Sequence, residues 1–291
     1  LLRLILDGHP DIACPGERDF MLDHLQGDGP SLTLDTAGLT RGRSFGIWGG
    51  PAPAASDGAA ALREMLAADR ARCGKRAHVL VLHRHLARLC DLLPGIKIIH
   101  LLRDPRDVAR SSIGMGWAGN TYYGIDHWLR TEREWDRVAV PSDRVETLKY
   151  EDLLEAPEPS LARLCAFMGL AYDPAMMNYA ASSTYEPIDP ALAYQWRRKQ
   201  GAREIADVEY KAGPLLTARG YVPSGKPAAA PAPLRRCWLA LENKRHIWRV
   251  RLRRYGLIDP VLVALGRKLR LPALGYAAQR RMDRKIVKYL R

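Results

Sequence analysis

Two short apolar runs, each followed by a helical pattern, occupy the middle of the chain. Residues 96–102 are almost wholly apolar, which is typical of a strand buried on both faces of a parallel sheet. Asp104 is a good N-cap and Pro105 suits a first helical turn, so a helix is expected to begin at once. The same order recurs in a predicted strand over 145–150 and a predicted helix over 159–168. This alternation predicts an α/β fold with a mostly parallel sheet.

Periodic spacing of apolar residues predicts further helices along the chain. They are expected at residues 1–7, 59–71, 79–92, 125–138, 174–181 and 202–219. Residues 27–58 are instead rich in Gly, Pro, Ser and Asp, which predicts irregular surface structure.

The net charge of +13 is concentrated at one end of the chain. Residues 225–291 hold 18 Lys+Arg and 3 Asp+Glu, a net charge of +15, which leaves −2 for residues 1–224. The Pro/Ala-rich stretch 223–233 is interpreted as a semi-extended linker. We therefore predict a domain over 1–224, a linker over 225–233 and a basic helical tail over 234–291.

The composition excludes several classes of protein. With 47% hydrophobic residues, the chain is neither disordered nor collagen-like, and at 291 residues it is no small disulfide scaffold. No apolar stretch approaches the ~20 residues that cross a bilayer. The five cysteines are far apart and lack metal-binding spacing, which favours free thiols in a reducing compartment and a cytoplasmic location. Because the first residue is Leu1, the natural start is expected upstream, and targeting stays open.

The junction after the 96–102 strand carries the most informative side chains. Arg103 stands at the expected carboxyl end of the strand, and Ser111 lies eight residues later in the expected helix. Ligands of open α/β sheets gather beyond the carboxyl ends of strands. An Arg there offers a bidentate fork to a phosphate, and a Ser hydroxyl adds a donor. The alternative is a surface Arg paired with a nearby Asp and an ordinary helical Ser; spacing alone does not decide between them.

Four segments resemble, in register, the sulfotransferases that use 3'-phosphoadenosine 5'-phosphosulfate (PAPS). LLRDPRDVARS resembles the family's 3'-phosphate-binding segment, and LLRLILDGHPDIACPGE resembles the helix after its phosphosulfate loop. LKYEDLLEAPEPSLARLCAFMGL resembles its YEDL strand and following helix, and residues 196–223 resemble the end of tyrosylprotein sulfotransferases and their bacterial relatives. The likeness covers residues 1–224. It implies a P-loop-like parallel sheet flanked by helices and transfer of a sulfuryl group from PAPS to a hydroxyl acceptor.

The resemblance implies roles for five residues. Arg103 and Ser111 match the positions that hold the 3'-phosphate of PAPS. Tyr150 and Trp196 match positions near the nucleotide or the cover of the active site. Glu17 matches the catalytic Glu of tyrosylprotein sulfotransferases, the general base that takes the proton of the attacking hydroxyl. Without the resemblance, Glu17 would be interpreted as a capping or ion-pairing residue and the two aromatic residues as core.

Three features depart from the family pattern. The phosphosulfate loop, a Pro-Arg-Ser-Gly-Thr-like segment, is expected immediately before Leu1, so the chain is interpreted as a fragment with impaired catalysis. Many relatives have Lys-Thr-Pro where this chain has Lys75 followed by Arg and Ala, which weakens a role for Lys75 in the acceptor pocket. Some relatives carry Lys where this chain has Gln195, so a group that stabilises sulfate charge is absent or supplied elsewhere.

The histidines do not indicate a metal site. His83 and His85 lie two residues apart on a predicted helix and therefore do not share a face, which argues against a metal pair. His100 lies inside the predicted strand and is interpreted as a hydrogen-bonded core residue. No metal cofactor is expected.

The tail has its own pattern. A stripe with spacings of four and three runs along its first helix, broken at Arg245: Leu234, Trp238, Leu241, Trp248, Leu252 and Tyr255. A second helix is predicted from Asp259 to about residue 271, and a third basic segment ends the chain. The stripe is interpreted as packing on the catalytic domain or lying on an anionic membrane surface. Nucleic acid is disfavoured because no recognition motif accompanies the charge.

Two functions follow from these observations. The first is a PAPS-dependent sulfotransferase, whose acceptor (a protein tyrosine, a sugar or a small molecule) depends on loops such as 27–58 and 113–124. The alternative is a non-catalytic protein with the same fold that binds an anionic surface or a partner through its tail. The sequence does not indicate an oligomeric state.

Overall fold

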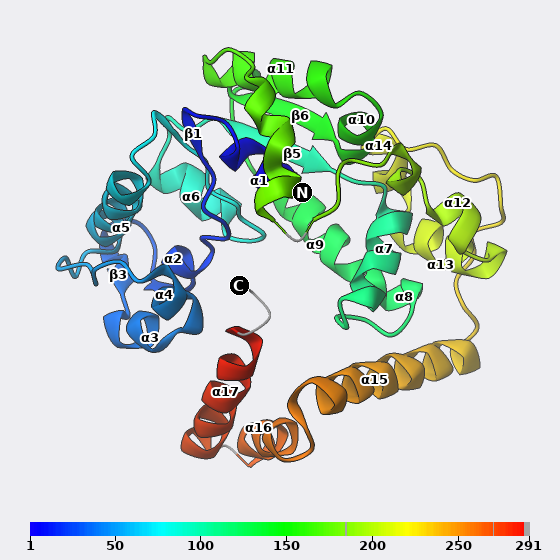
Figure 1. Ribbon diagram of the computed structural model, residues 1–291. Coiled ribbons are helices and arrows are strands. Elements are labelled where there is room, and N and C mark those ends of the chain that lie inside the picture. The colour runs from blue at the N-terminus through cyan, green and yellow to red at the C-terminus, as the bar shows by residue number, and fades with distance from the viewer. Residues whose placement is uncertain (184, 270, 288–291) are drawn as a thin grey trace. The chain divides into compact units, whose positions relative to one another are not determined.

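A computed structural model describes residues 1–183, 185–269 and 271–287 (Figure 1). The chain divides into two compact units, each built from two stretches of sequence. The first unit consists of Leu1–Arg103 and Arg130–Ala193, and the second of Asp104–Leu129 and Tyr194–Arg291. The boundary predicted at residues 225–233 rests on composition and charge and stays a prediction.

The elements of the first unit are mostly short. Its helices are α1 (Leu2–Asp7), α2 (Phe20–Asp23), α3 (Thr36–Arg41), α4 (Arg43–Trp48), α5 (Gly58–Cys73), α6 (Leu86–Leu92), α10 (Tyr150–Glu155) and α11 (Pro157–Met168). Its 3₁₀ turns are η1 (Gly29–Ser31), η2 (Ser142–Arg144), η3 (Pro174–Ser182) and η4 (Pro190–Leu192). Its strands are β1 (Ile12–Ala13), β2 (Leu25–Gln26), β3 (Thr33–Leu34), β4 (Ala77–His78), β5 (Ile98–Leu102) and β6 (Val145–Lys149).

The second unit is helical over the residues described. Its helices are α7 (Pro105–Gly114), α8 (Thr121–Gly124), α12 (Trp196–Lys199), α13 (Ala202–Ala212), α14 (Pro214–Ala218), α15 (Pro233–Tyr255), α16 (Ile258–Lys268) and α17 (Pro272–Val287). Helix α9 (Asp126–Trp135) begins in this unit and ends in the first.

Parallel strand pairs confirm the predicted α/β class. Strands β5 and β6 pair over their whole length, from Ile98 opposite Val145 to Leu102 opposite Lys149. Strand β1 pairs in parallel with β4, and β2 pairs antiparallel with β3. Because β5 and β6 are parallel, the residues that follow them, including Arg103 and Tyr150, leave the same edge of the sheet.

The first unit has two apolar clusters. One joins α1 and β1 to β6, α10 and α11, and its fully buried members include Ile5, Leu148 and Leu164. The other joins α2 and the 27–58 segment to α5 and includes Leu39 and Leu62.

The segment over 27–58 is more ordered than its composition predicts. It contains α3 and α4, and it buries Leu32, Leu39 and Trp48. The reason is local: the Asp35 carboxylate accepts the N–H of Gly38 and caps α3, so an Asp within a stretch of loop-like composition begins a helix. The prediction of irregular surface structure was wrong for these residues.

The prediction of one helix over 79–92 was also wrong, because only residues 86–92 are helical. The N–H of Val79 donates to the carbonyl of Ala13 in β1, and the carbonyl of Val81 accepts the N–H of Arg18. His85 then adopts a left-handed conformation with φ of 64°. Long-range pairing therefore takes the backbone groups that a helix would have used, and His83 and His85 do not lie on a helix.

Two other predicted helices differ in kind or continuity. The helix predicted over 174–181 is the 3₁₀ helix η3. The helix predicted over 202–219 is two helices, because Gly213 has φ of 53° and ψ of −139° and Pro214 restarts the helix. The remaining predicted strands and helices are confirmed to within a few residues.

The described residues of the tail form the two predicted helices, and the third basic segment contains helix α17, but α15 packs with a different face. Leu239 is buried, and the Asn243 side-chain carbonyl accepts the N–H of Gly119, whereas Leu234, Trp238 and Leu241 of the predicted stripe are exposed. Of the two interpretations of the stripe, packing on the domain is therefore wrong for these three residues, whereas Leu252 and Tyr255 are half-buried. Residues 270 and 288–291 of the predicted tail lie outside the described residues. Among the described helices, none is long and apolar enough to cross a bilayer.

A substitution in β6 tests the parallel sheet as the centre of the first unit. Leu148 is fully buried, and its neighbour across the ladder, Leu101, is 42% exposed. Leu148→Ala should lower the free energy of unfolding by about 2–5 kcal/mol, because a buried cavity replaces the side chain. Leu101→Ala, the matched control, should cost about 1 kcal/mol or less. Urea denaturation measures both, and equal losses would contradict this assignment of the core.

Candidate functional site

Arg103 and Tyr150 meet at the carboxyl ends of β5 and β6. The Arg103 guanidinium carbon lies 4.6 Å from the centre of the Tyr150 ring, within the range of a cation–π contact. Arg103 Nε is buried, and among the described residues no hydrogen-bond partner satisfies it. A buried, unsatisfied donor on a charged group is costly, and each such group calls for an explanation. An anion supplied from outside the described chain would satisfy it.

Ser111 belongs to the second unit and lies on α7. Its side chain is exposed, whereas that of the next residue, Ser112, is buried with its Oγ donating to the carbonyl of Val108 at 3.0 Å. Of these two adjacent hydroxyl groups, Ser111 therefore faces solvent and Ser112 is used inside the helix. Because Arg103 and Ser111 lie in different units, each is placed only within its own unit.

The second Arg of the RDPRD sequence is an internal residue. Arg106 is 2% exposed, and it donates from Nε and Nη2 to the Asp104 carboxylate at 2.9 and 2.7 Å. Its Nη1 donates to Glu209 Oε1 at 2.7 Å. Burial alone would lower the pKa of Arg106, but the hydrogen bonds that it donates to both carboxylates raise it. Asp104 also accepts the N–H of Arg106 and so caps α7.

Trp196 is enclosed in the second unit. Its Nε1 donates to Asp104 Oδ2 at 2.9 Å, and its backbone N–H donates to Asp107 Oδ1 at 2.7 Å. The Arg106 guanidinium lies 3.7 Å from the centre of its ring. These are the contacts of a core aromatic residue, and the role of Trp196 near the nucleotide stays a prediction.

Glu17 lies beside a buried carboxylate and a histidine in the first unit. Glu17 is exposed, and its Oε1 lies 4.0 Å from His83 Nε2. The other ring nitrogen, His83 Nδ1, lies 3.3 Å from Asp19 Oδ2. Asp19 is buried, and its Oδ1 accepts the backbone N–H groups of His83 and Arg84 at 2.8 and 3.0 Å. The His83 imidazole thus lies between the buried carboxylate of Asp19 and the solvent-facing carboxylate of Glu17.

Hydrogen bonding sets the charge state of this cluster. The hydrogen bond to Asp19 raises the pKa of His83 against the opposing effect of burial. Burial would raise the pKa of Asp19, but the hydrogen bonds from His83 outweigh it and lower that pKa. Asp19 is therefore ionised at neutral pH, and its hydrogen bond favours the protonated form of the imidazole that faces Glu17.

The sequence analysis missed Asp19 and His83 as neighbours of Glu17. His83 is 66 residues from Glu17 along the chain. The wrong prediction of a helix over 79–92 gave no reason to expect that residues 79–83 extend alongside the backbone near Glu17. The parallel bridge between Glu17 and Val81 brings them together. Only long-range strand pairing carries this information, and no local spacing does.

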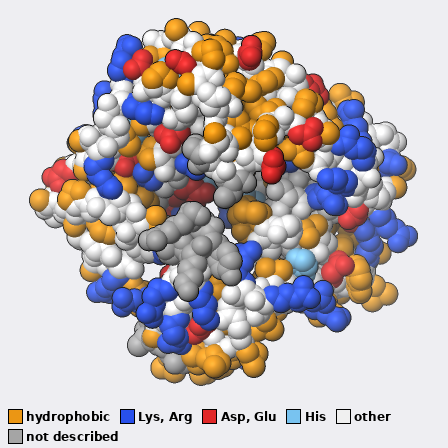
Figure 2. Space-filling view, viewed as in Figure 1, with side chains coloured by type: hydrophobic (Ala, Val, Ile, Leu, Met, Phe, Trp, Pro, Cys, Tyr) orange, Lys and Arg blue, Asp and Glu red, His pale blue; other side chains and the backbone are white. Residues whose placement is uncertain are grey.

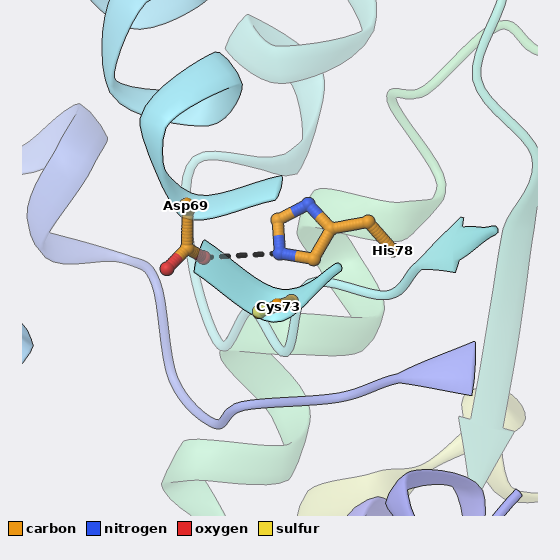
Figure 3. Close-up of side chains that lie close together, drawn as sticks. All are labelled: Asp69, Cys73 and His78. Atoms are coloured by element: carbon orange, nitrogen blue, oxygen red, sulfur yellow. Dashed lines mark hydrogen bonds and ion pairs between the residues drawn. The ribbon is translucent and has the colours of Figure 1, made fainter. Parts of the chain in front are cut away.

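A second cluster, shown in Figure 3, combines Asp69, Cys73 and His78. These side chains are ligand types for a metal ion, but the Asp69 carboxylate is already fully used. It accepts two hydrogen bonds from Arg18 at 2.7 and 3.0 Å, one from Trp48 Nε1 at 2.7 Å, and contacts His78 Nε2 at 3.0 Å. Burial raises the pKa of the Cys73 thiol. The cluster is thus a buried ion pair rather than a set of ligands awaiting a cation.

Lys75 and His100 have structural contacts. The Lys75 ammonium donates to the carbonyls of Asp7, His9 and Ile12 at 2.8 to 3.0 Å, which uses its three protons. His100 Nε2 lies 3.2 Å from Glu132 Oε2, and its ring stacks on that of Trp135. The prediction of His100 as a hydrogen-bonded core residue is confirmed.

Comparisons with known proteins agree on the family. The sequence matches the model described as "Sulfotransferase family" over residues 1–174. Among solved structures, the chain is similar to the sulfotransferase domain from the Synechococcus PCC 7002 olefin synthase, at 21% identity and a TM-score of 0.52 over 73% of this chain and 89% of that one. It is also similar to the sulfotransferase domain from the curacin biosynthetic pathway, at 16% identity and a TM-score of 0.52 over 76% and 93%.

Because both identities are low, these similarities to solved structures show the fold alone. A comparison with curated proteins finds no match. The family match covers more than half of the sequence and includes Glu17, Arg103, Ser111 and Tyr150. On this ground, the chain belongs to the sulfotransferase family.

Proposed function

We propose that the protein transfers a sulfuryl group from PAPS to a hydroxyl acceptor. One observation carries this proposal: Arg103, above the Tyr150 ring at the ends of two parallel strands, has a buried Nε for which the described residues supply no acceptor. A phosphate oxygen is the acceptor that an Arg at this position of an α/β sheet commonly finds. The sulfotransferase resemblance of the surrounding sequence supports the proposal that this phosphate is the 3'-phosphate of PAPS.

Each proposed nucleotide residue has a distinct task. Arg103 binds the 3'-phosphate through its guanidinium fork, and Ser111 adds a neutral donor from the exposed face of α7. Tyr150 holds the guanidinium through a cation–π contact, so that Arg103 is ordered before the nucleotide binds. PAPS itself supplies an activated sulfuryl group whose leaving group is a phosphate.

Glu17 is proposed as the general base. An acceptor hydroxyl must lose its proton as its oxygen attacks sulfur, and a carboxylate that faces solvent, as that of Glu17 does, can accept it. His83 is proposed as a positioning residue, because Asp19 fixes its ring and turns Nε2 toward Glu17.

Nucleotide binding tests Arg103 in the full-length protein. Arg103→Ala should raise the Kd for 3'-phosphoadenosine 5'-phosphate by about 10- to 100-fold, the loss expected for hydrogen bonds between charged groups. Isothermal titration calorimetry measures this change. The control is Arg163→Ala, which removes an exposed Arg paired with Glu146 in the same unit and should leave the Kd unchanged. An unchanged Kd for Arg103→Ala would remove the nucleotide assignment.

Two adjacent serines provide a matched pair for the second donor. Ser111→Ala should weaken binding of the same nucleotide about 3- to 10-fold, because one neutral hydrogen bond is lost. Ser112→Ala should leave the affinity as it is, since that hydroxyl donates to Val108 inside α7. Calorimetry under identical conditions compares them, and the reverse order of effects would contradict the role of Ser111.

Turnover tests the base. Glu17→Gln keeps the shape of the side chain and removes its ability to take a proton, so kcat should fall about 10²- to 10⁴-fold. Release of 3'-phosphoadenosine 5'-phosphate from PAPS, measured with tyrosine-peptide, sugar and phenol acceptors, reports kcat. The affinity for the nucleotide should not change. If the variant turned over at the wild-type rate, Glu17 would not be the base.

The protonation of His83 predicts a pH dependence of stability. Its pKa is raised in the folded protein, so its contribution is fully present below about pH 6.5 and is lost as pH rises through the folded pKa. The difference in unfolding free energy between wild type and His83→Gln should therefore shrink from pH 6 toward pH 9. Asp19 stays ionised over this whole range. Urea denaturation across this range measures it. Since both proteins contain His78, its titration cancels, and a constant difference would contradict the raised pKa.

A further inference from the structure

Helix α15 uses one face inside the second unit. Leu239 is buried, and Asn120 Nδ2 donates to the Leu239 carbonyl and to Glu242 Oε2, both at 2.9 Å. Asn243 accepts the N–H of Gly119 at 2.7 Å. These contacts fix the helix against residues 116–120 and determine which face is turned away.

The opposite face is apolar and exposed. Leu234 is 87% exposed, Trp238 58%, Leu241 65% and Trp248 36%. At about 3.6 residues per turn these four side chains lie along one line, here called the α15 stripe, and Leu239 and Asn243 lie on the far side of the helix. Large apolar side chains exposed in a row, here interrupted at Arg245, mark an interaction site.

Cations flank the α15 stripe on both sides. Arg249 lies along one edge of the row, and Lys244 and Arg251 lie along the other. Arg245 lies within the row, between Leu241 and Trp248, and all four cations are exposed. Trp238, Arg245 and Arg249 line a depression of about 330 Å³ together with His246. Figure 2 has the same view as Figure 1. In the region where Figure 1 shows α15, Lys and Arg side chains lie beside hydrophobic ones.

We propose that the α15 stripe binds the surface of an anionic phospholipid membrane. Trp and Leu side chains enter the boundary between headgroups and acyl chains, while flanking Arg and Lys side chains contact the lipid phosphates. Residues 225–291 carry a net charge of +15, which complements such a surface at about 1 kcal/mol per basic residue near it. The helix then lies in the plane of the interface and does not cross the membrane.

Charge favours this occupant over two others. A second copy of the chain would bring its own +15 segment against the first, and like charges would oppose the contact. A nucleic acid would complement the charge, but its backbone offers no apolar layer for the exposed Leu234 and Leu241. A lipid interface satisfies both the cations and the apolar row.

Vesicle co-sedimentation with the full chain tests the proposal. Vesicles of phosphatidylcholine with about 30% phosphatidylserine should bind at least about tenfold more tightly than pure phosphatidylcholine. Raising the salt from about 0.1 to 0.5 M should weaken that binding. Trp238→Ser with Trp248→Ser should weaken it about tenfold or more, whereas Tyr185→Ser, at an exposed aromatic residue of the first unit, should not.

A charge-matched pair isolates the position of the cations. Arg245→Glu with Arg249→Glu should abolish the preference for phosphatidylserine, and Arg63→Glu with Arg70→Glu, which changes the net charge equally on α5, should retain it. Circular dichroism confirms that each variant keeps its helices. Equal effects of the two pairs, or binding that ignores phosphatidylserine, would overturn the proposal. Dimerisation in light scattering that the Trp variant abolishes would assign the stripe to a second copy and overturn it as well.

Discussion

The second unit depends on one buried carboxylate, that of Asp104. It caps α7, receives two hydrogen bonds from Arg106 and one from Trp196, and is fully buried. Arg106 continues the network to Glu209 on α13, so three helices meet at one ion pair. Taking these charges out of water is costly, and removing one partner of such a pair typically costs about 3–5 kcal/mol. The start of the helix that carries Ser111 is therefore fixed by electrostatics as much as by apolar packing.

The first unit has a comparable centre in Asp69. Its carboxylate holds Arg18, Trp48 and His78, and burial would raise its pKa were it not for the hydrogen bond from Arg18 that lowers it. Arg18 follows Glu17 directly and donates to the Glu17 carbonyl at 3.2 Å. Both proposed polar positions, Glu17 and Arg103, thus precede a residue of a buried ion network. Each of these two groups is anchored through its neighbour in sequence.

The sequence predicted what depends on local pattern and missed what depends on distant pairing. The apolar run of β5 and the cap at Asp104 are local, and they contributed to the prediction of the α/β class. The backbone of 79–85 is held by β1 and by Asp19, more than sixty residues away, and periodicity does not contain that information. For the same reason Glu17 could be selected by resemblance but the pairing of His83 with Asp19 could not. Helical spacing also found the α15 stripe without showing that the opposite face would be the packed one.

Two glycines determine how closely α15 approaches the rest of its unit. A Cβ atom at Gly116 would lie 2.5 Å from a Val250 methyl carbon, and one at Gly119 would lie 2.6 Å from the Asn243 Cα atom. Gly116 also has φ of 77°, a conformation that other residues rarely adopt. With the helix already held this closely, little conformational entropy remains to be lost when its outer face meets a surface. A membrane would then encounter a preformed rigid element, unlike the many amphipathic segments that must fold as they bind.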